Sequence, residues 1–353
     1  MKNYILHIGL PKTGTTAIQK HFFSRLNNNS TIYNPLVILN SLKQAIKLVD
    51  FDMFKEDDIE LLKNVIENQE KKIKQKNILI SLETLSLRML RFDYKKRLKF
   101  IKAIFPNARI IIVLRHQESI LRSLYQQHVY QNYFLNPKDV FLPFSNIKFA
   151  YNEKWKRCMQ IDINDWNYVD LIKEFSFHYK DKLSILFYEN YKSNITNIGS
   201  EILKIAGIKF DNSSDINIPR TNISYDLITM FIVIIMAKHK IAFRSNYGYD
   251  SKIMNNLLLQ ARKSRSLYDN KDVDKFINNI KLLKNHSKTI YSKFDKYILK
   301  IIRYYSRICS KYRFLQYKLP KLIRNLIKEK SRVYNKELEK MIDKKLIPSQ
   351  YLN

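Results

Sequence analysis

Two glycines, a lysine and three threonines stand together near the start of the chain, where residues 9–16 read GLPKTGTT. The phosphate loop of nucleotide-binding proteins, GxxxxGK[ST], has its glycines at the same separation and ends in the same type of hydroxyl residue. Here Thr15 stands where that loop has its lysine, and a lysine lies inside the loop at Lys12. Such a turn between a strand and a helix directs backbone N–H groups at one point, which attracts phosphate or sulfate oxygens. The segment therefore predicts an anion-binding site.

The elements that must hold this loop are visible as short apolar runs that alternate with helical patterns. Four runs rich in Ile, Leu and Val are separated by about 30 or more residues, and this spacing is typical of βαβ units around a parallel sheet. Between them, apolar residues recur with the period of an α-helix, as at Ile18, Phe22 and Leu26. The pattern predicts an α/β fold, a P-loop-like three-layer αβα core with a central parallel sheet. The predicted strands are Tyr4–Ile8, Asn77–Ser81, Ala108–Leu114 and Leu183–Tyr188.

The chain of 353 residues is strongly basic, with 63 Lys and Arg against 32 Asp and Glu and a net charge of +31. Hydrophobic residues make up 45%, which argues against intrinsic disorder and predicts a packed core. Positions 251–353 hold 26 Lys and Arg against eight Asp and Glu. Helix-spaced apolar residues in this region, such as Ile298 and Ile301, predict basic helices rather than a tail. We therefore predict a core from 1 to 245 and a basic, mainly helical region from 246 to 353.

Cysteine usage and hydropathy indicate the compartment. Cys158 and Cys309 are far apart in the sequence and have no Cys or His neighbours at metal-ligand spacing, so neither a disulfide framework nor a zinc site is predicted. The apolar start is interrupted by Pro11 and Lys12 before a signal-peptide core is complete. The longest apolar run, Leu227 to Ala237, is too short to span a bilayer. We expect a cytoplasmic protein.

Residues 11–16, PKTGTT, resemble the 5′-phosphosulfate loop of the bacterial type of sulfotransferases that use 3′-phosphoadenosine-5′-phosphosulfate (PAPS), whose pattern is PK[ST]G[TS][TS]. The family has a second signature, a strand that ends in Arg with a Ser eight residues later on the next helix. Residues 110–125 read IIIVLRHQESILRSLY, so Arg115 and Ser123 match it. In the family these residues hold the 3′-phosphate of PAPS. The physics agrees, because Arg binds phosphate bidentately and a hydroxyl two helical turns along adds another donor.

The resemblance covers roughly residues 1–225 and implies further contacts with PAPS. Residues 185–190, ILFYEN, are similar to the end of a family strand, [RY][YF]E[DN], which implies that Tyr188 lines the adenine pocket. The alternative is a structural tyrosine at a strand end. The glycine-rich nucleotide loop of the cytosolic small-molecule enzymes is not recognisable, and Arg220 could supply a replacement phosphate contact. The implied cofactor-binding residues are Pro11, Lys12, Thr13, Gly14, Thr15, Thr16, Arg115, Ser123, Tyr188 and Arg220.

Two residues are predicted to act in the chemistry, since sulfuryl transfer depends mostly on positioning and on charge stabilisation. Lys12 would stabilise negative charge on the leaving 5′-phosphate. Glu83 follows the strand at Asn77–Ser81, near the position where relatives place a catalytic His or Glu, and would accept the proton of the acceptor hydroxyl. The alternative is that Glu83 caps the next helix. The resembling family requires no metal, and no acidic cluster here predicts one.

The predicted reaction is transfer of a sulfuryl group from PAPS to a hydroxyl of a glycan or glycolipid, with release of adenosine 3′,5′-bisphosphate (PAP). A net charge of +31 suits an anionic glycan or an anionic membrane, because basic surfaces concentrate anionic partners. We expect peripheral contact with the inner membrane leaflet and no specific nucleic acid.

Three alternatives remain open at this point. The loop could be an ordinary turn in which Gly14 is the turn glycine and Thr15 or Thr16 caps the helix. The protein could be a nucleotide-dependent kinase with a modified phosphate loop, although Thr15 in place of the lysine argues against it. It could also be a basic nucleic-acid-binding protein, although no helix-turn-helix, RNA-recognition or zinc-finger signature is present.

Overall fold

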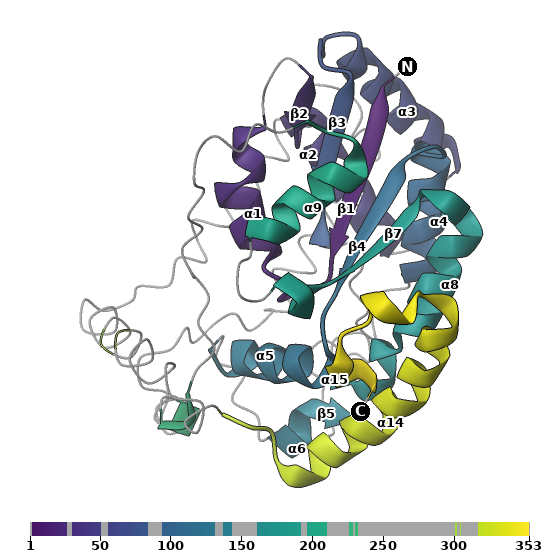
Figure 1. Cartoon of the computed structure of the whole chain (residues 1–353). Coiled ribbons are helices and arrows are strands. Elements are labelled where there is room, and N and C mark those ends of the chain that lie inside the picture. The colour runs from purple at the N-terminus through teal and green to yellow at the C-terminus, as the bar shows by residue number, and fades with distance from the viewer. Residues whose placement is uncertain are drawn as a thin grey trace. The chain divides into compact units, whose positions relative to one another are not determined.

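The central feature of the computed structural model is a sheet of five parallel strands (Figure 1). Its order is β2-β3-β1-β4-β7, and β1, the strand before the loop, pairs with β3 and β4. Four of the strands confirm the predicted ones. The additional strand, β2, has only three residues, too few to give a recognisable period. The strands are β1 (Asn3–Gly9), β2 (Thr31–Tyr33), β3 (Asn77–Ser81), β4 (Arg109–Leu114) and β7 (Leu183–Phe187).

The structure describes residues 2–26, 30–50, 56–83, 94–130, 137–142, 161–191, 196–209, 226–228, 230–231, 301, 304 and 317–352. The chain divides into two compact units. The first comprises 1–121, 141–221 and 321–353, and the second comprises 122–140 and 222–320. Arg220 and most of the predicted basic region lie outside the described residues. The site described below belongs to the first unit.

Helices cover both faces of the sheet, which confirms the three-layer αβα architecture (Figure 1). On one face lie α1 (Thr15–His21) and α9 (Thr196–Ala206), which contact each other. The opposite face carries α2 (Leu36–Asp50), α3 (Glu56–Glu70), α4 (Tyr94–Ile104) and α8 (Tyr168–Tyr179). None of the helices formed by the described residues is both long enough and apolar enough to cross a membrane. The other described elements are α5 (Gln117–Tyr130), α6 (Pro137–Val140), the two-stranded sheet β5 (Phe141–Leu142) and β6 (Ile161–Asp162), and the 3-10 helices η1 (Phe23–Arg25), η3 (Ile163–Trp166), η4 (Lys180–Lys182), η5 (Tyr188–Tyr191) and η7 (Lys344–Leu346).

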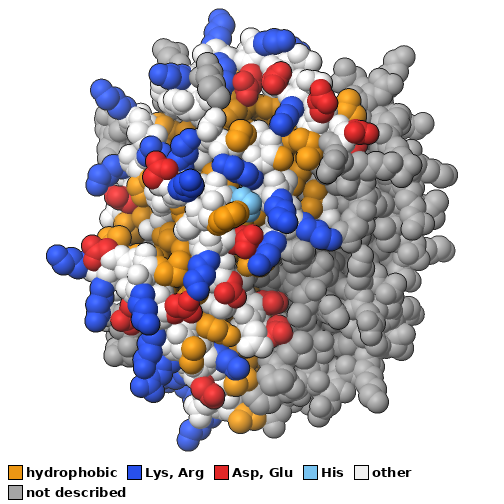
Figure 2. Space-filling model, turned by 90° about the vertical axis from the view of Figure 1, so that its right-hand side faces the viewer, with side chains coloured by type: hydrophobic (Ala, Val, Ile, Leu, Met, Phe, Trp, Pro, Cys, Tyr) orange, Lys and Arg blue, Asp and Glu red, His pale blue; other side chains and the backbone are white. Residues whose placement is uncertain are grey.

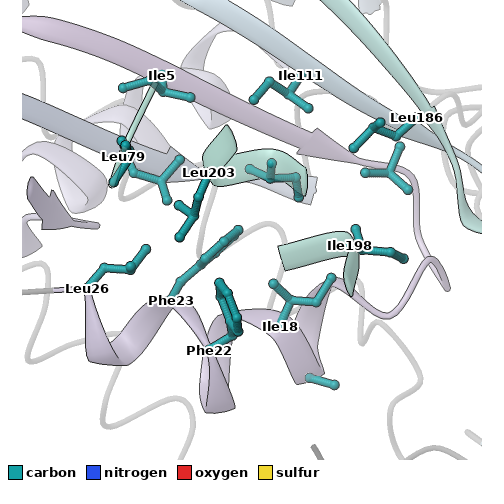
Figure 3. Packing of buried hydrophobic residues seen from close by; sticks show 14 residues of the cluster. Ile5, Ile18, Phe22, Phe23, Leu26, Leu79, Ile111, Leu186, Ile198 and Leu203 are labelled. Atoms are coloured by element: carbon teal, nitrogen blue, oxygen red, sulfur yellow. The ribbon is translucent and has the colours of Figure 1, made fainter. Parts of the chain in front are cut away.

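The core under α1 and α9 fixes the position of the loop between β1 and α1 (Figure 3). Ile5, Leu79 and Ile111 come from three neighbouring strands and are buried beneath these helices. Phe22, at the end of α1, is fully buried, and a Cβ atom added to Gly199 of α9 would lie 2.7 Å from its ring. The missing side chain therefore lets α9 approach α1 closely.

The C-terminal residues belong to the same compact unit as the sheet. The long helix α14 (Lys321–Met341) packs against α8 and is followed by the short helix α15 (Ser349–Leu352). Its buried face consists of Ile323, Ile327, Ser331, Asn335 and Leu338, spaced at three or four residues. Residues 321–353 thus pack with the unit that contains the sheet, while the predicted division at residue 245 stays a prediction.

Candidate active site

The loop between β1 and α1 is held in shape by its own threonines. Thr13 Oγ1 donates a hydrogen bond of 2.7 Å to the carbonyl of Leu10 and lies 2.9 Å from Thr15 Oγ1, and both threonines are buried. The Leu10 N–H donates to the carbonyl of Val113 at 3.2 Å, which ties the loop to β4. A Cβ atom on Gly9 would lie 2.3 Å from Thr15 Oγ1, so only glycine fits there.

The backbone of this loop has the form of an anion-binding concavity. Lys12 and Gly14 both have left-handed conformations, with φ angles of 69° and 78°. Left-handed residues alternating with right-handed ones turn successive N–H groups toward one side, as in phosphate-binding nests. A left-handed conformation costs a residue other than glycine about 1–2 kcal/mol, so Lys12 must be held there by its surroundings. Arg115 contributes to this, because its guanidinium donates to the Lys12 carbonyl.

Glu83 and Lys12 come together beside this loop. The Glu83 carboxylate accepts hydrogen bonds from the side chains of Thr15 and Thr16 and interacts electrostatically with Lys12. Burial raises the pKa of Glu83, while Lys12 and the two threonines act against that rise. Burial likewise lowers the pKa of the Lys12 ammonium. The negative charge of Glu83 acts against this fall in pKa, while the positive charge of Arg115 adds to it. A carboxylate and an ammonium group thus lie together in one partly desolvated place, and the two threonine hydroxyls donate to Glu83.

A buried polar network fixes the end of β3, from which Glu83 extends. His7 Nδ1 lies 2.7 Å from Ser81 Oγ, and Gln19 Nε2 of α1 donates to the same oxygen at 2.8 Å. The N–H of Leu82 donates to the carbonyl of His7 at 3.0 Å, so β3 remains bound to β1 for one residue beyond its end. Burial lowers the pKa of His7 to about 3, which keeps the ring neutral. His7 therefore supports the site from within the core.

Arg115 forms the second half of the site at the end of β4. Its guanidinium lies 4.9 Å from the ring centre of Tyr188, which follows β7, and reaches the Lys12 carbonyl. The hydroxyl of Tyr168 donates to the carbonyl of Arg115. Arg115 Nε is buried and has no hydrogen-bond partner among the described residues. Lys12, Glu83, Arg115 and Tyr188 are thus gathered at the carboxyl edge of the sheet, which is where ligands bind in open α/β folds.

The remaining predicted residues lie as follows. Pro11 is buried within the loop. Ser123 lies on α5, in the part of that helix that belongs to the second compact unit, and Arg220 lies outside the described residues. The part of the chain that the structure describes contains no group of three or more His, Cys, Asp or Glu residues that could hold a metal ion.

One residue of the site, Glu189, has no role in the sequence prediction. Its Oε1 accepts a hydrogen bond of 2.9 Å from the backbone N–H of His116, the residue after Arg115. Burial raises the pKa of Glu189, and the bond from His116 acts against that rise. The only signal in the sequence is its place in the Tyr-Glu-Asn segment at the end of β7, which does not reveal what the carboxylate contacts.

A glycine-containing loop on the first strand of a parallel αβα sheet, with an arginine on the neighbouring strand, defines a P-loop-like anion-binding protein. The sequence model of the sulfotransferase domain matches residues 2–227, so the chain belongs to the sulfotransferase family and is a PAPS-dependent enzyme of sulfuryl transfer. No curated protein sequence matches the chain.

Three solved structures resemble this fold at low sequence identity. A sulfotransferase from Alicyclobacillus acidocaldarius is 12% identical with a TM-score of 0.40, and the match covers 68% of this chain and 96% of that one. A mouse sulfotransferase complexed with PAP is 13% identical with a TM-score of 0.32, over 67% of this chain and 65% of that one. The sulfotransferase domain from the curacin biosynthetic pathway is 12% identical with a TM-score of 0.33, and the match covers 60% of this chain and 76% of that one.

Proposed function

We propose that Lys12 and Glu83 carry the transfer of a sulfuryl group to a hydroxyl of an anionic glycan or glycolipid. The observation that supports this is that the two side chains lie together beside the loop, where burial raises the pKa of Glu83 and lowers that of Lys12. A carboxylate with a raised pKa is a better proton acceptor near neutral pH, and a partly buried cation interacts more strongly with developing charge.

The donor fits the residues on this edge of the sheet. PAPS, when bound, supplies the sulfuryl group and a nucleotide leaving group. The N–H groups of the loop would hold its 5′ side, because the concavity at Lys12 and Gly14 is suited to anionic oxygens. Arg115 Nε, which has no hydrogen-bond partner within the described part of the chain, is a buried donor for the 3′-phosphate, and the Tyr188 ring offers a face to the base.

Each of the two proposed catalytic residues has one task. Glu83 takes the proton of the acceptor hydroxyl while the oxygen of that hydroxyl attacks the sulfur. Lys12 stabilises the negative charge that collects on the departing phosphate oxygen. Thr15 and Thr16 orient the Glu83 carboxylate through their hydrogen bonds, while the network at Ser81 fixes the strand from which it extends.

The charge of the protein supports an anionic acceptor. The net charge is +31, and the face in Figure 2 shows Lys and Arg side chains spread widely with Asp and Glu between them. On α14, Lys328, Arg332 and Lys336 are exposed. A basic surface of this kind concentrates anionic glycans or anionic lipid headgroups near the enzyme.

A transfer assay with labelled PAPS tests this proposal. The acceptors are an anionic polysaccharide, a neutral polysaccharide, a glycolipid in vesicles, and a simple phenol as the non-glycan control. We expect label on the anionic glycan or the glycolipid and none on the phenol. Transfer to the phenol alone would contradict the glycan acceptor while leaving sulfuryl transfer intact. A thermal-shift series with PAP, ATP and GTP checks the donor separately, since only PAP should raise the melting temperature.

A further inference from the structure

The C-terminal segment contacts the turn that carries Arg115. Gln117 begins α5 two residues after Arg115, and its Nε2 donates a hydrogen bond of 2.9 Å to Asn335 Oδ1 of α14. Both side chains are buried, with exposed fractions of 1% and 5%. Asn190 Nδ2, beyond the end of β7, donates to the carbonyl of Leu346 at 3.1 Å. Residues after 320 thus touch the chain beyond both β4 and β7.

Tyr351 makes the most direct of these contacts. Only 2% of the residue is exposed, and its hydroxyl donates a hydrogen bond of 3.2 Å to Glu189 Oε2. Its ring packs edge-on against His116 and Phe187, with ring centres 5.4 Å and 5.1 Å away. The other oxygen of the same carboxylate, Glu189 Oε1, accepts from the N–H of His116. One carboxylate therefore joins the third residue from the C-terminus to the residue that follows Arg115.

These contacts fix the backbone on which Arg115 is carried. The peptide that joins Arg115 to His116 is bonded at both of its polar groups, by the Tyr168 hydroxyl at the carbonyl and by Glu189 at the N–H. Glu189 itself is partly buried, so its carboxylate is stabilised by hydrogen-bond donors, and the Tyr351 hydroxyl is one of them. Loss of that donor would loosen the carboxylate and with it the direction of the Arg115 guanidinium.

We infer that Tyr351 is a positioning residue of the PAPS site, which acts through Glu189 and Arg115 on the binding of the nucleotide. The inference rests on the proposed role of Arg115 toward the 3′-phosphate. It places part of the cofactor site in a segment that lies beyond residue 227, where the match to the sulfotransferase domain ends.

The test is the full-length Tyr351→Phe variant, which removes one hydroxyl and keeps the ring packing. We expect the dissociation constant for PAP and the KM for PAPS to rise about tenfold, while kcat stays within about twofold of wild type. Tyr179→Phe is the matched control, because the Tyr179 hydroxyl is also buried but has no hydrogen-bond partner among the described residues. It should leave KM unchanged. Glu189→Gln, which interrupts the same link, should repeat the KM defect.

A double-mutant cycle separates positioning from a general loss of structure. If Tyr351 acts through Arg115, Tyr351→Phe should have no further effect on PAP binding in an Arg115→Ala background. Additive effects, or a normal KM in Tyr351→Phe together with weakened binding in Arg115→Ala, would overturn the inference. If Arg115→Ala itself binds PAP normally, the proposed role of Arg115 is wrong, which is a different failure.

Discussion

At the residue scale, the proposed stabilisation of charge on the leaving phosphate depends on the ammonium of Lys12. Lys12→Ala should lower kcat at least about 100-fold, close to 2.7 kcal/mol of transition-state stabilisation, because a preorganised charge contact is removed. The fold should survive, since the side chain belongs to a loop and alanine tolerates the left-handed conformation about as well as lysine. Steady-state kinetics and a thermal melt measure the two effects. Lys20→Ala is the control, because Lys20 is an exposed lysine on α1. Activity of Lys12→Ala within about tenfold of wild type would remove Lys12 from the mechanism.

Substitution of Glu83 should lower turnover without affecting the binding of the nucleotide. Glu83→Gln keeps the size of the side chain but cannot accept a proton, so we expect kcat to fall about 100-fold or more while PAP raises the melting temperature as in wild type. Normal turnover would reduce Glu83 to a structural partner of Thr15 and Thr16.

The pH profile gives an independent check on Glu83. In the proposed role its carboxylate acts only when deprotonated, and burial raises its pKa above the ordinary value of 4.5. Activity should therefore be present above that raised pKa and be lost as the pH falls through it, at a higher pH than for an exposed glutamate. The acid limb of kcat against pH should disappear in Glu83→Gln. An unchanged limb in that variant would assign it to another group.

At the scale of elements, the contact between α1 and α9 holds the helix that follows the loop. Gly199→Ala places a Cβ atom 2.7 Å from the buried ring of Phe22, so either that ring or one of the helices must shift. Alanine gains about 1 kcal/mol in helix propensity, but overpacking costs about 1–3 kcal/mol, so the free energy of unfolding should fall by up to about 2 kcal/mol. Urea unfolding measures this loss.

A second substitution tests the cause of that loss. Gly199→Ala combined with Phe22→Leu should be less destabilised than the sum of the single variants, because the smaller side chain makes room for the methyl group. Ser200→Ala, the next residue of α9, should change the stability by less than about 0.5 kcal/mol. Strict additivity of Gly199→Ala and Phe22→Leu would show that the two residues do not compete for space.

At the scale of the whole molecule, we propose that the basic surface brings the enzyme to anionic membranes. Lys328, Arg332 and Lys336 are exposed on α14. Changing all three to Glu should weaken co-sedimentation with vesicles that contain anionic lipid, because each basic residue near the membrane surface contributes about 1 kcal/mol to the binding free energy. Binding of the wild-type chain should also fall as salt rises above about 0.15 M.

The control for this prediction keeps the same change of net charge. Lys71, Lys72 and Lys74 are exposed in the connection between α3 and β3, and changing them to Glu should have a smaller effect. Removal of the whole C-terminal segment is unsuitable as a test, because α14 packs on α8. If the wild-type chain ignores anionic vesicles even at low salt, the membrane role is wrong and the charge serves the acceptor alone.

The features that could be predicted from the sequence are those encoded by neighbouring residues. The glycines and threonines of the loop follow an apolar strand directly, and four of the five strands have enough residues to show their pattern. Even the meeting of Glu83 with Lys12 has a local cause, because both follow buried strands and parallel pairing of β1 with β3 brings their carboxyl ends to one edge. The fold class and the meeting of Glu83 with Lys12 therefore follow from short segments and the rules of parallel sheets, while the roles of the site residues stay predictions.

The features that only the tertiary structure decides depend on contacts between distant parts of the chain. The orientation of Thr15 and Thr16 toward Glu83 depends on side-chain rotamers that no spacing specifies. Asn335 lies 218 residues from Gln117, and Tyr351 lies 162 residues from Glu189. A buried polar side chain needs a partner, but the sequence does not say which of many distant groups will be brought to it. The packing of α14 on α8 makes that choice, and so the C-terminal end of the chain becomes part of the site.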